Sequence, residues 1–306
     1  MKRLEIWAAA ATPFDPDGEL APDVVKAQVQ HLSENDVDGA FVAGTSGEFP
    51  ALSVEEREEL VDTWAAQRLE GLRLGVHVGH LDLRQAQRLA AHAEKLGADM
   101  VASVAPFYGE SGVEHTVRWL AEVAAAAPRT PFCFYHIPAM TGSSVRPSEL
   151  VARAAREIPT LAYVKFTDNN MLEFDETRAA APQVRVFFGR DELLPSALAF
   201  GAEGVIGSLY NALAPVARAI AAASAHGRHA MALDLHRVFR EIARAADQHG
   251  GPGFVKELMN RLGPDAGVSR SPWGPLDPDG RTAVEELVPL VQRAVSSARA
   301  QVPDLR

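Results

Sequence analysis

The sequence predicts a (β/α)8 TIM barrel, an α/β fold, followed by a C-terminal helical extension. Short apolar runs with strand character alternate with longer amphipathic stretches along most of the 306 residues. Alternation of this kind indicates a parallel sheet, and eight such units over about 225 residues have the size of a closed barrel. A doubly wound open sheet is the competing architecture. It usually carries a glycine-rich nucleotide fingerprint after its first strand, and the sequence has none there.

The expected strands are apolar runs of strand length. In chain order they are residues 6–11, 39–42, 72–78, 99–105, 132–135, 161–166, 184–188 and 204–206. Apolar residues at helical spacing predict helices between them, at 53–68, 82–96, 113–127, 147–157 and 171–181. Residues 228–306 show helical patterns and no further strands. We therefore expect a single domain, with the catalytic barrel over 1–227 and the helical extension over 228–306.

Composition excludes several classes of protein. A formal net charge of −10 repels phosphate backbones, so we expect no nucleic-acid partner. The one cysteine, Cys133, lies in an apolar run and can form neither a disulfide framework nor a cysteine-ligated zinc site. The N-terminus lacks the apolar stretch of a signal peptide, and the alanine-rich runs are too short or interrupted to span a membrane. These features predict a cytoplasmic protein without a membrane partner.

Lysine usage singles out one residue. Of 30 basic residues, only Lys2, Lys26, Lys95, Lys165 and Lys256 are lysines, and all but Lys165 lie at the terminus or in polar, helix-like surroundings. Lys165 ends an apolar strand, where a charged ammonium is costly unless it loses its proton. A neutral amine can attack a ketone, and arginine cannot supply one. The alternative is a strand-end lysine that reaches water. The barrel favours catalysis, because catalytic groups gather at the C-terminal ends of its strands.

Three further motifs follow expected strands. The loop Gly44-Thr45-Ser46-Gly47-Glu48 exposes hydroxyls and backbone N–H groups that can bind a carboxylate, although a lone motif of this kind is more often a simple turn. Tyr135 could relay protons or be a half-buried strand residue. Gly189-Arg190-Asp191-Glu192 closes a strand and begins a helix, where acidic residues are favoured by the helix dipole. Their common position at the C-terminal strand ends is what predicts a single site.

A metal-dependent enzyme is the first alternative from another class. His77 and His80 form a close histidine pair at the end of an expected strand. No third ligand is evident nearby, so a structural role for these histidines is the preferred interpretation. A non-catalytic binding protein on the same scaffold is the second alternative, and it should tolerate the loss of Lys165.

These motifs together resemble the pyruvate-dependent class I aldolase family that contains dihydrodipicolinate synthase and N-acetylneuraminate lyase. The resemblance runs from about residue 6 to the C-terminal helices. It rests on Gly44-Thr45-Ser46-Gly47-Glu48, Tyr135-His136-Ile137-Pro138, Val164-Lys165 and Gly204-Val205-Ile206-Gly207-Ser208. It implies that Lys165 forms a Schiff base with a 2-oxo acid and that Tyr135 relays protons. It also implies that Thr45 and Ser46 hold the pyruvyl carboxylate. The family uses no metal or organic cofactor and is usually homotetrameric.

The same resemblance bears on the substrate. Dihydrodipicolinate synthases usually carry a carboxylate-binding arginine where this chain has Met140, and methionine cannot make that bond. The segments around Tyr135, Lys165 and Ser208 are more similar to sialic acid lyases. In those enzymes the residues that match Thr167, Gly189, Asp191, Glu192 and Ser208 bind the sugar hydroxyls. Arg190 departs from the aromatic or apolar residue expected there, and its charge could favour an acidic sugar tail.

The resulting expectation is a lyase that cleaves a 2-oxo sugar acid, with N-acetylneuraminate as the first choice. Its products would be pyruvate and an aldehyde, N-acetylmannosamine. An aldolase or dehydratase for 2-keto-3-deoxy sugar acids is the main alternative within the family, since the imine step is shared. Dihydrodipicolinate synthase activity is less favoured because of Met140.

Overall fold

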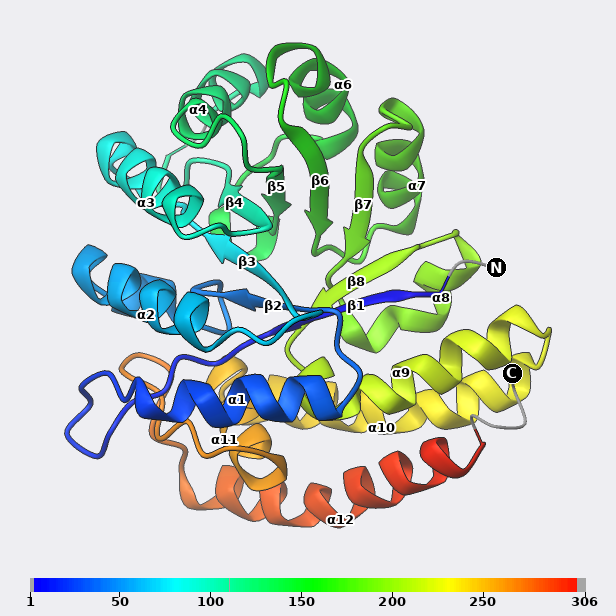
Figure 1. Ribbon diagram of the computed structural model, residues 1–306. Coiled ribbons are helices and arrows are strands. Elements are labelled where there is room, and N and C mark those ends of the chain that lie inside the picture. Colours follow the sequence, from blue (N-terminus) through cyan, green and yellow to red (C-terminus); the bar gives the residue numbers. More distant parts are fainter. Residues whose placement is uncertain (1–2, 110, 302–306) are drawn as a thin grey trace.

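A computed structural model describes residues 3–109 and 111–301 and shows a closed barrel of eight parallel strands in the order β1 to β8 (Figure 1). The strands are β1 (Glu5–Ala9), β2 (Gly39–Val42), β3 (Arg73–His77), β4 (Met100–Val104), β5 (Phe132–His136), β6 (Leu161–Phe166), β7 (Arg185–Phe188) and β8 (Gly204–Gly207). Each pairs with its neighbours in parallel register, and β1 closes the barrel on β8. The predicted fold class is therefore confirmed.

A helix covers each strand on the outside of the barrel. In chain order these helices are α1 (Asp23–Glu34), α2 (Val54–Gln67), α3 (Leu83–Lys95), α4 (Val113–Ala125), α6 (Pro147–Glu157), α7 (Met171–Ala180), α8 (Leu194–Ala199) and α9 (Tyr210–Ala225). Local signals fix several starts: Ser53 and Glu56 form a capping box at α2, and Asp82 caps α3. Three one-turn helices were not predicted, because one turn is too short to show a helical period: η1 (Phe49–Ala51), α5 (Pro138–Thr141) and η2 (Asp191–Leu193).

Side chains alternate along each strand between the barrel interior and the helix layer. On β6, Tyr163 packs with the interior cluster, whereas Val164 and Phe166 join the larger core beneath the helices. Lys165 shares the inward face with Tyr163, and its Nζ lies over interior aromatic rings. The interior cluster consists of Trp7, Ala9, Phe41, Met100, Ala102, Val104, Cys133, Tyr135, Ile137, Phe187 and Ile206. This alternation brings the lysine and tyrosine predicted to act together into the same interior.

The C-terminal extension consists of α10 (His229–Gln248), α11 (Pro252–Leu262) and α12 (Pro278–Gln301). These helices pack on one another and on α9, and Figure 1 shows them gathered with α1 and α9 along one side of the barrel. The turn between α9 and α10 spans residues 226–228. Among the described residues, no helix has both the length and the apolar character needed to cross a membrane.

Candidate active site

Lys165 lies near the C-terminal end of β6 with only 4% of its surface exposed. Its Nζ is 4.1 Å from the ring centroid of Tyr135 and 4.5 Å from that of Phe41. No hydrogen bond or ion pair joins this Nζ to another residue in the described part of the chain. The amine is thus buried, faces the barrel interior and has no carboxylate partner, unlike a strand-end lysine that reaches water.

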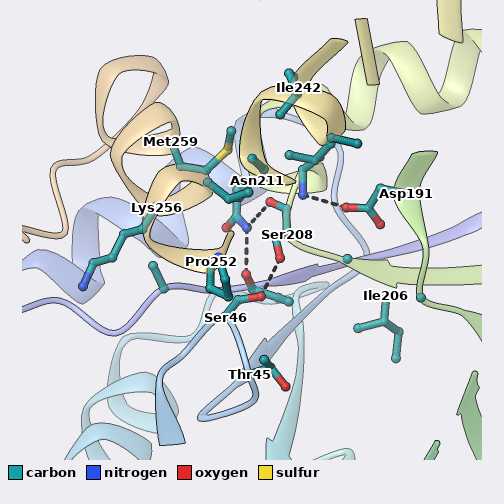
Figure 2. A pocket seen from close by; sticks show the side chains of 18 of the residues that line it. Thr45, Ser46, Asp191, Ile206, Ser208, Asn211, Ile242, Pro252, Lys256 and Met259 are labelled. Carbon is teal, nitrogen blue, oxygen red and sulfur yellow. Dashed lines mark hydrogen bonds between the residues drawn. The ribbon is translucent and has the colours of Figure 1, made fainter. Parts of the chain in front are cut away.

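Hydroxyl groups from three different strand ends line the same cavity as the amine. Tyr135 on β5 is the register partner of Lys165, and its Oη lies 3.2 Å from Oγ1 of Thr45 in the loop after β2. The neighbouring Ser46 forms a hydrogen bond with Ser208, which follows β8 (Figure 2). Either hydroxyl of each pair can donate, so the pairs can reorganise when an acceptor such as a carboxylate enters.

One cavity of about 230 Å³ joins Lys165 to the ends of β6, β7 and β8. All nine residues predicted for the site line it: Thr45, Ser46, Tyr135, Lys165, Thr167, Gly189, Asp191, Glu192 and Ser208. Three buried polar atoms beside this cavity have no hydrogen-bond partner in the described residues, namely Oγ1 of Thr167, Nε of Arg190 and Oδ1 of Asp191. Because buried polar atoms are nearly always paired, these three indicate a place for a polar ligand.

Asp191 is held in place by the backbone around it. Its Oδ2 accepts a hydrogen bond of 2.8 Å from the N–H of Leu209 (Figure 2). Burial raises the pKa of the Asp191 carboxyl to about 7, and the nearby Glu192 adds to the rise. Gly207 leaves the necessary space, since a Cβ there would lie 1.6 Å from Oδ1 of Asp191. Near neutral pH this carboxyl can therefore act as hydrogen-bond donor or acceptor.

Arg190 and Glu192 form an ion pair at the same end of the cavity. Nη2 of Arg190 lies 2.6 Å from Oε1 of Glu192, and both side chains are partly exposed. The pair neutralises the charge of Glu192 and fixes its position. Arg190, unexplained by the resemblance, is thus both a cavity-lining residue and the partner of a predicted ligand residue.

The C-terminal extension forms a wall of the cavity, which the sequence analysis did not predict. Ile242 and Asp247 of α10 and Met259 and Lys256 of α11 line it. Lys256, expected in polar, helix-like surroundings, does lie on a helix, but it is only 3% exposed, and its Nζ pairs with Oε1 of Glu48 at 2.8 Å. Its place in an apparently amphipathic helix carried no local signal of burial; the scarcity of lysine was the only available hint.

The structure also places Met140 and the two histidines considered as metal ligands. Met140 lies on α5 with an exposed side chain and is absent from the cavity lining.

His77 is fully buried, and its Nδ1 donates to the carbonyl of Ala43 at 3.0 Å. Burial lowers the pKa of His77 well below its usual value, so the ring is neutral. His80 accepts a hydrogen bond from the N–H of Asp82 instead of turning to a shared ligand. The described residues contain no group of three His, Cys, Asp or Glu side chains that could hold a metal ion.

Comparison with known proteins places this site in a family. The profile of the Dihydrodipicolinate synthetase family matches residues 2–290. N-acetylneuraminate lyase of Gallus gallus is 41% identical over 218 residues, which cover 69% of this chain and 71% of that protein. Proteus mirabilis N-acetylneuraminate lyase has a similar structure, with a TM-score of 0.90 at 31% identity over 95% of this chain and 99% of the other. The structure of YagE from E. coli K12 in complex with pyruvate gives a TM-score of 0.85 at 25% identity, over 95% and 98% of the two chains.

Since the profile spans nearly the whole chain, the chain belongs to the dihydrodipicolinate synthetase family. Within the family it is an N-acetylneuraminate lyase-like aldolase, a carbon–carbon lyase. The resemblance drawn from the sequence motifs and the predicted class of enzyme are both confirmed.

Proposed function

We propose that the protein cleaves a 2-oxo sugar acid reversibly to pyruvate and an aldehyde, with N-acetylneuraminate as substrate and N-acetylmannosamine as the aldehyde. The observation that carries the proposal is the set of residues that line the cavity. The buried amine of Lys165 lines it together with Thr167, Arg190 and Asp191, each of which has a buried polar atom without a hydrogen-bond partner among the described residues. Such a cavity suits a molecule with a ketone near one end and several hydroxyls at the other.

In the cleavage direction, Thr45, Ser46 and the N–H groups of their loop hold the substrate carboxylate. The amine of Lys165 attacks the ketone at C2, water leaves, and a protonated imine forms. This imine serves as the electron sink for the next step, so no organic cofactor is needed for it. The aromatic rings around Nζ keep water from competing for the amine.

Carbon–carbon cleavage follows when the C4 hydroxyl loses its proton. The C3–C4 bond breaks, its electron pair passes into the imine, and C4 leaves as an aldehyde carbon. Tyr135, whose ring contacts Nζ of Lys165, is the candidate for carrying this proton, with Thr167 as a second hydroxyl nearby. Protonation of the remaining enamine at C3 and hydrolysis of the imine release pyruvate and restore the amine.

At the far end of the cavity, we assign the sugar hydroxyls to Thr167, Gly189, Asp191, Glu192 and Ser208. Gly189 lets the chain approach closely, since a Cβ there would lie 2.1 Å from Oγ1 of Thr167. Carboxylates and hydroxyls can each accept from or donate to a row of sugar hydroxyls. The relatives of 41% and 31% identity, both N-acetylneuraminate lyases, support the choice of sugar acid.

A second candidate, an aldolase or dehydratase for 2-keto-3-deoxy sugar acids, is favoured by one feature. Arg190 brings a cation to the cavity, where an acid group on the sugar tail could bind it. The imine step is the same, so Lys165 does not separate the two candidates. A non-catalytic binding protein would keep its ligand affinity when Lys165 is replaced, whereas an aldolase would lose turnover.

A pyruvate-release assay across N-acetylneuraminate and several 2-keto-3-deoxy sugar acids tests the proposal. We expect the highest kcat/KM with N-acetylneuraminate and a stoichiometric aldehyde product. A higher kcat/KM with a keto-deoxy acid would transfer the proposal to the second candidate. Consumption of the substrate without release of pyruvate would indicate a dehydratase, because loss of water leaves the carbon chain intact.

We further propose a cytoplasmic homotetramer whose interface involves the catalytic end of the barrel. Four exposed apolar side chains, Leu81, Tyr108, Met140 and Leu172, follow the C-terminal ends of β3 to β6 in turn. Neighbouring exposed apolar groups often mark protein interfaces. The buried thiol of Cys133, whose pKa burial raises to about 12, is inert and suits a reducing compartment. Sedimentation equilibrium should give four times the mass of the chain.

A further inference from the structure

The loop proposed to hold the substrate carboxylate has a left-handed residue at each end. Ala43 has φ 51° and Glu48 has φ 55°, and neither is a glycine. A side chain in this region costs energy unless the surrounding structure holds it there. Ala43 is held by the hydrogen bond from His77 to its carbonyl. Glu48, at the other end, is held by groups from the C-terminal extension.

Both oxygens of the Glu48 carboxylate are used. Oε1 accepts 2.8 Å from Nζ of Lys256 on α11, and Oε2 accepts 2.8 Å from the backbone N–H of Arg270. Glu48 is 1% and Lys256 3% exposed, so the ion pair is isolated from water. An ion pair this deeply buried adds little net stability, which points to a role in fixing conformation.

Lys256 also contacts the loop indirectly, through hydrogen bonds that pass over Thr12. Its Nζ donates 2.8 Å to the carbonyl of Thr12, and Oγ1 of Thr12 donates 2.6 Å to the carbonyl of Gly47. One ammonium thus connects α11 to the last two residues of the loop. In Figure 2 the Lys256 side chain extends away from the Ser46–Ser208 hydroxyls, so it supports the loop without joining that hydroxyl pair.

We propose that Glu48 and Lys256 are a positioning pair, through which the C-terminal extension holds the carboxylate-binding loop in its strained conformation. The inference rests on the proposed function, because it assigns the carboxylate to Thr45 and Ser46. Those two residues lie between the two left-handed positions, so loosening Glu48 lets their hydroxyls and N–H groups move out of alignment. The affinity for the 2-oxo acid then falls, while the amine of Lys165 keeps its surroundings on β6.

The test is borohydride trapping of pyruvate as a function of pyruvate concentration, in the wild type and in Lys256→Met and Glu48→Gln/Lys256→Met. Loss of a buried charge-assisted hydrogen bond should raise the half-saturating pyruvate concentration about tenfold or more in both variants, with little change in the plateau of trapped protein. Thermal unfolding is measured in parallel. The single variant leaves Glu48 buried without its partner and should lose stability, and the double variant should regain much of it.

Arg261→Met is the matched control, because Arg261 lies on the same helix α11 and pairs with the surface residues Glu257 and Glu285. Arg261→Met should leave the half-saturating pyruvate concentration unchanged. The positioning role would be overturned if the double variant returned to the wild-type values of both thermal stability and half-saturating pyruvate concentration. The pair would then act on stability alone. An unchanged half-saturation in Lys256→Met would overturn it too. If the wild type failed to trap pyruvate at all, the proposed function itself would fall together with this inference.

Discussion

At the scale of single residues, Asp191 shows how the site departs from ordinary protein chemistry. A carboxyl group without a cationic partner is buried against the start of α9, and this burial raises its pKa to about 7. Perturbed groups of this kind gather at functional sites, where stability is given up for chemistry. The proposed contact with sugar hydroxyls explains why the position keeps an acid.

This shift predicts how stability depends on pH. The pKa of Asp191 is about 7 in the folded protein against 3.8 as the ordinary value, so the folded state binds more protons between these two pH values. Stability should therefore fall as pH rises through this window and level off above it. Asp191→Asn removes the effect, so its stability relative to the wild type should increase from about pH 5 to about pH 8. Urea unfolding of both proteins at several pH values measures this; a pH-independent difference would contradict the assigned pKa.

Arg190 carries a prediction about specificity. In Arg190→Leu, Glu192 loses its ion-pair partner, and a partly exposed pair contributes little, so binding of a neutral-tailed sugar acid should weaken only a few-fold. A substrate with a carboxylate on its tail should lose about tenfold or more, because the direct charged contact disappears. Steady-state KM values for both substrate types measure this, with Arg237→Leu on the surface of α10 as control. An equal rise in KM for both substrate types would mean that Arg190 does not bind the carboxylate on the sugar tail.

The single residues were predictable from the sequence to different degrees. Lys165 could be singled out because lysine is rare in this chain and this one ends an apolar run at the C-terminal end of an expected barrel strand. Lys256 could not, because its burial depends on α11 turning that face toward the loop after β2. A local pattern does not contain such a contact, which joins residues 208 positions apart.

At the scale of elements, the barrel strands determine which side chains enter the site. Alternation along β5 and β6 turns Tyr135 and Lys165 inward together, and their register makes them direct neighbours. The strands were predictable because their apolar runs are short and bounded, with differences of one or two residues at the ends. The short elements α5 and η2 were not, since they depend on how the chain turns over the barrel rim.

The end of β8 gives a prediction for an element. In Gly207→Ala the added methyl would collide with the Asp191 carboxyl, which must move away from Leu209. We expect a loss of about 1–3 kcal/mol of stability and a weaker affinity for the sugar acid. Thermal unfolding and KM measure these effects. Gly112→Ala is the control, since a Cβ there meets nothing within 4 Å. Unchanged KM in Gly207→Ala would show that Asp191 does not contact the sugar.

At the scale of the whole molecule, the extension is part of the catalytic structure. Helices α10 and α11 supply one wall of the cavity, and α11 and the segment after it hold Glu48. The sequence predicted helices there but gave no sign that they complete the site, because amphipathic spacing does not say which surface a helix covers. We propose that residues 1–227 and 228–306 fold as one unit.

One cooperative unit predicts coincident unfolding transitions. Urea unfolding followed by far-UV circular dichroism reports mainly on helices, including those of the extension. In a Trp273→Phe variant, tryptophan fluorescence reports on the barrel alone, because the remaining tryptophans, Trp7, Trp64 and Trp119, precede the extension. Both signals should give the same midpoint at a fixed protein concentration. An earlier transition seen by dichroism alone would mean that the extension unfolds separately.

The central claim is that Lys165 forms an imine with a 2-oxo acid. Incubation with pyruvate and borohydride, followed by peptide mass spectrometry, measures it most directly. We predict a pyruvate-derived mass addition on the peptide that carries Lys165. Lys165→Ala should show no addition and no turnover, although its circular dichroism spectrum should match that of the wild type. Equal labelling of the wild type and Lys165→Ala, or labelling at Lys256 instead, would contradict the account.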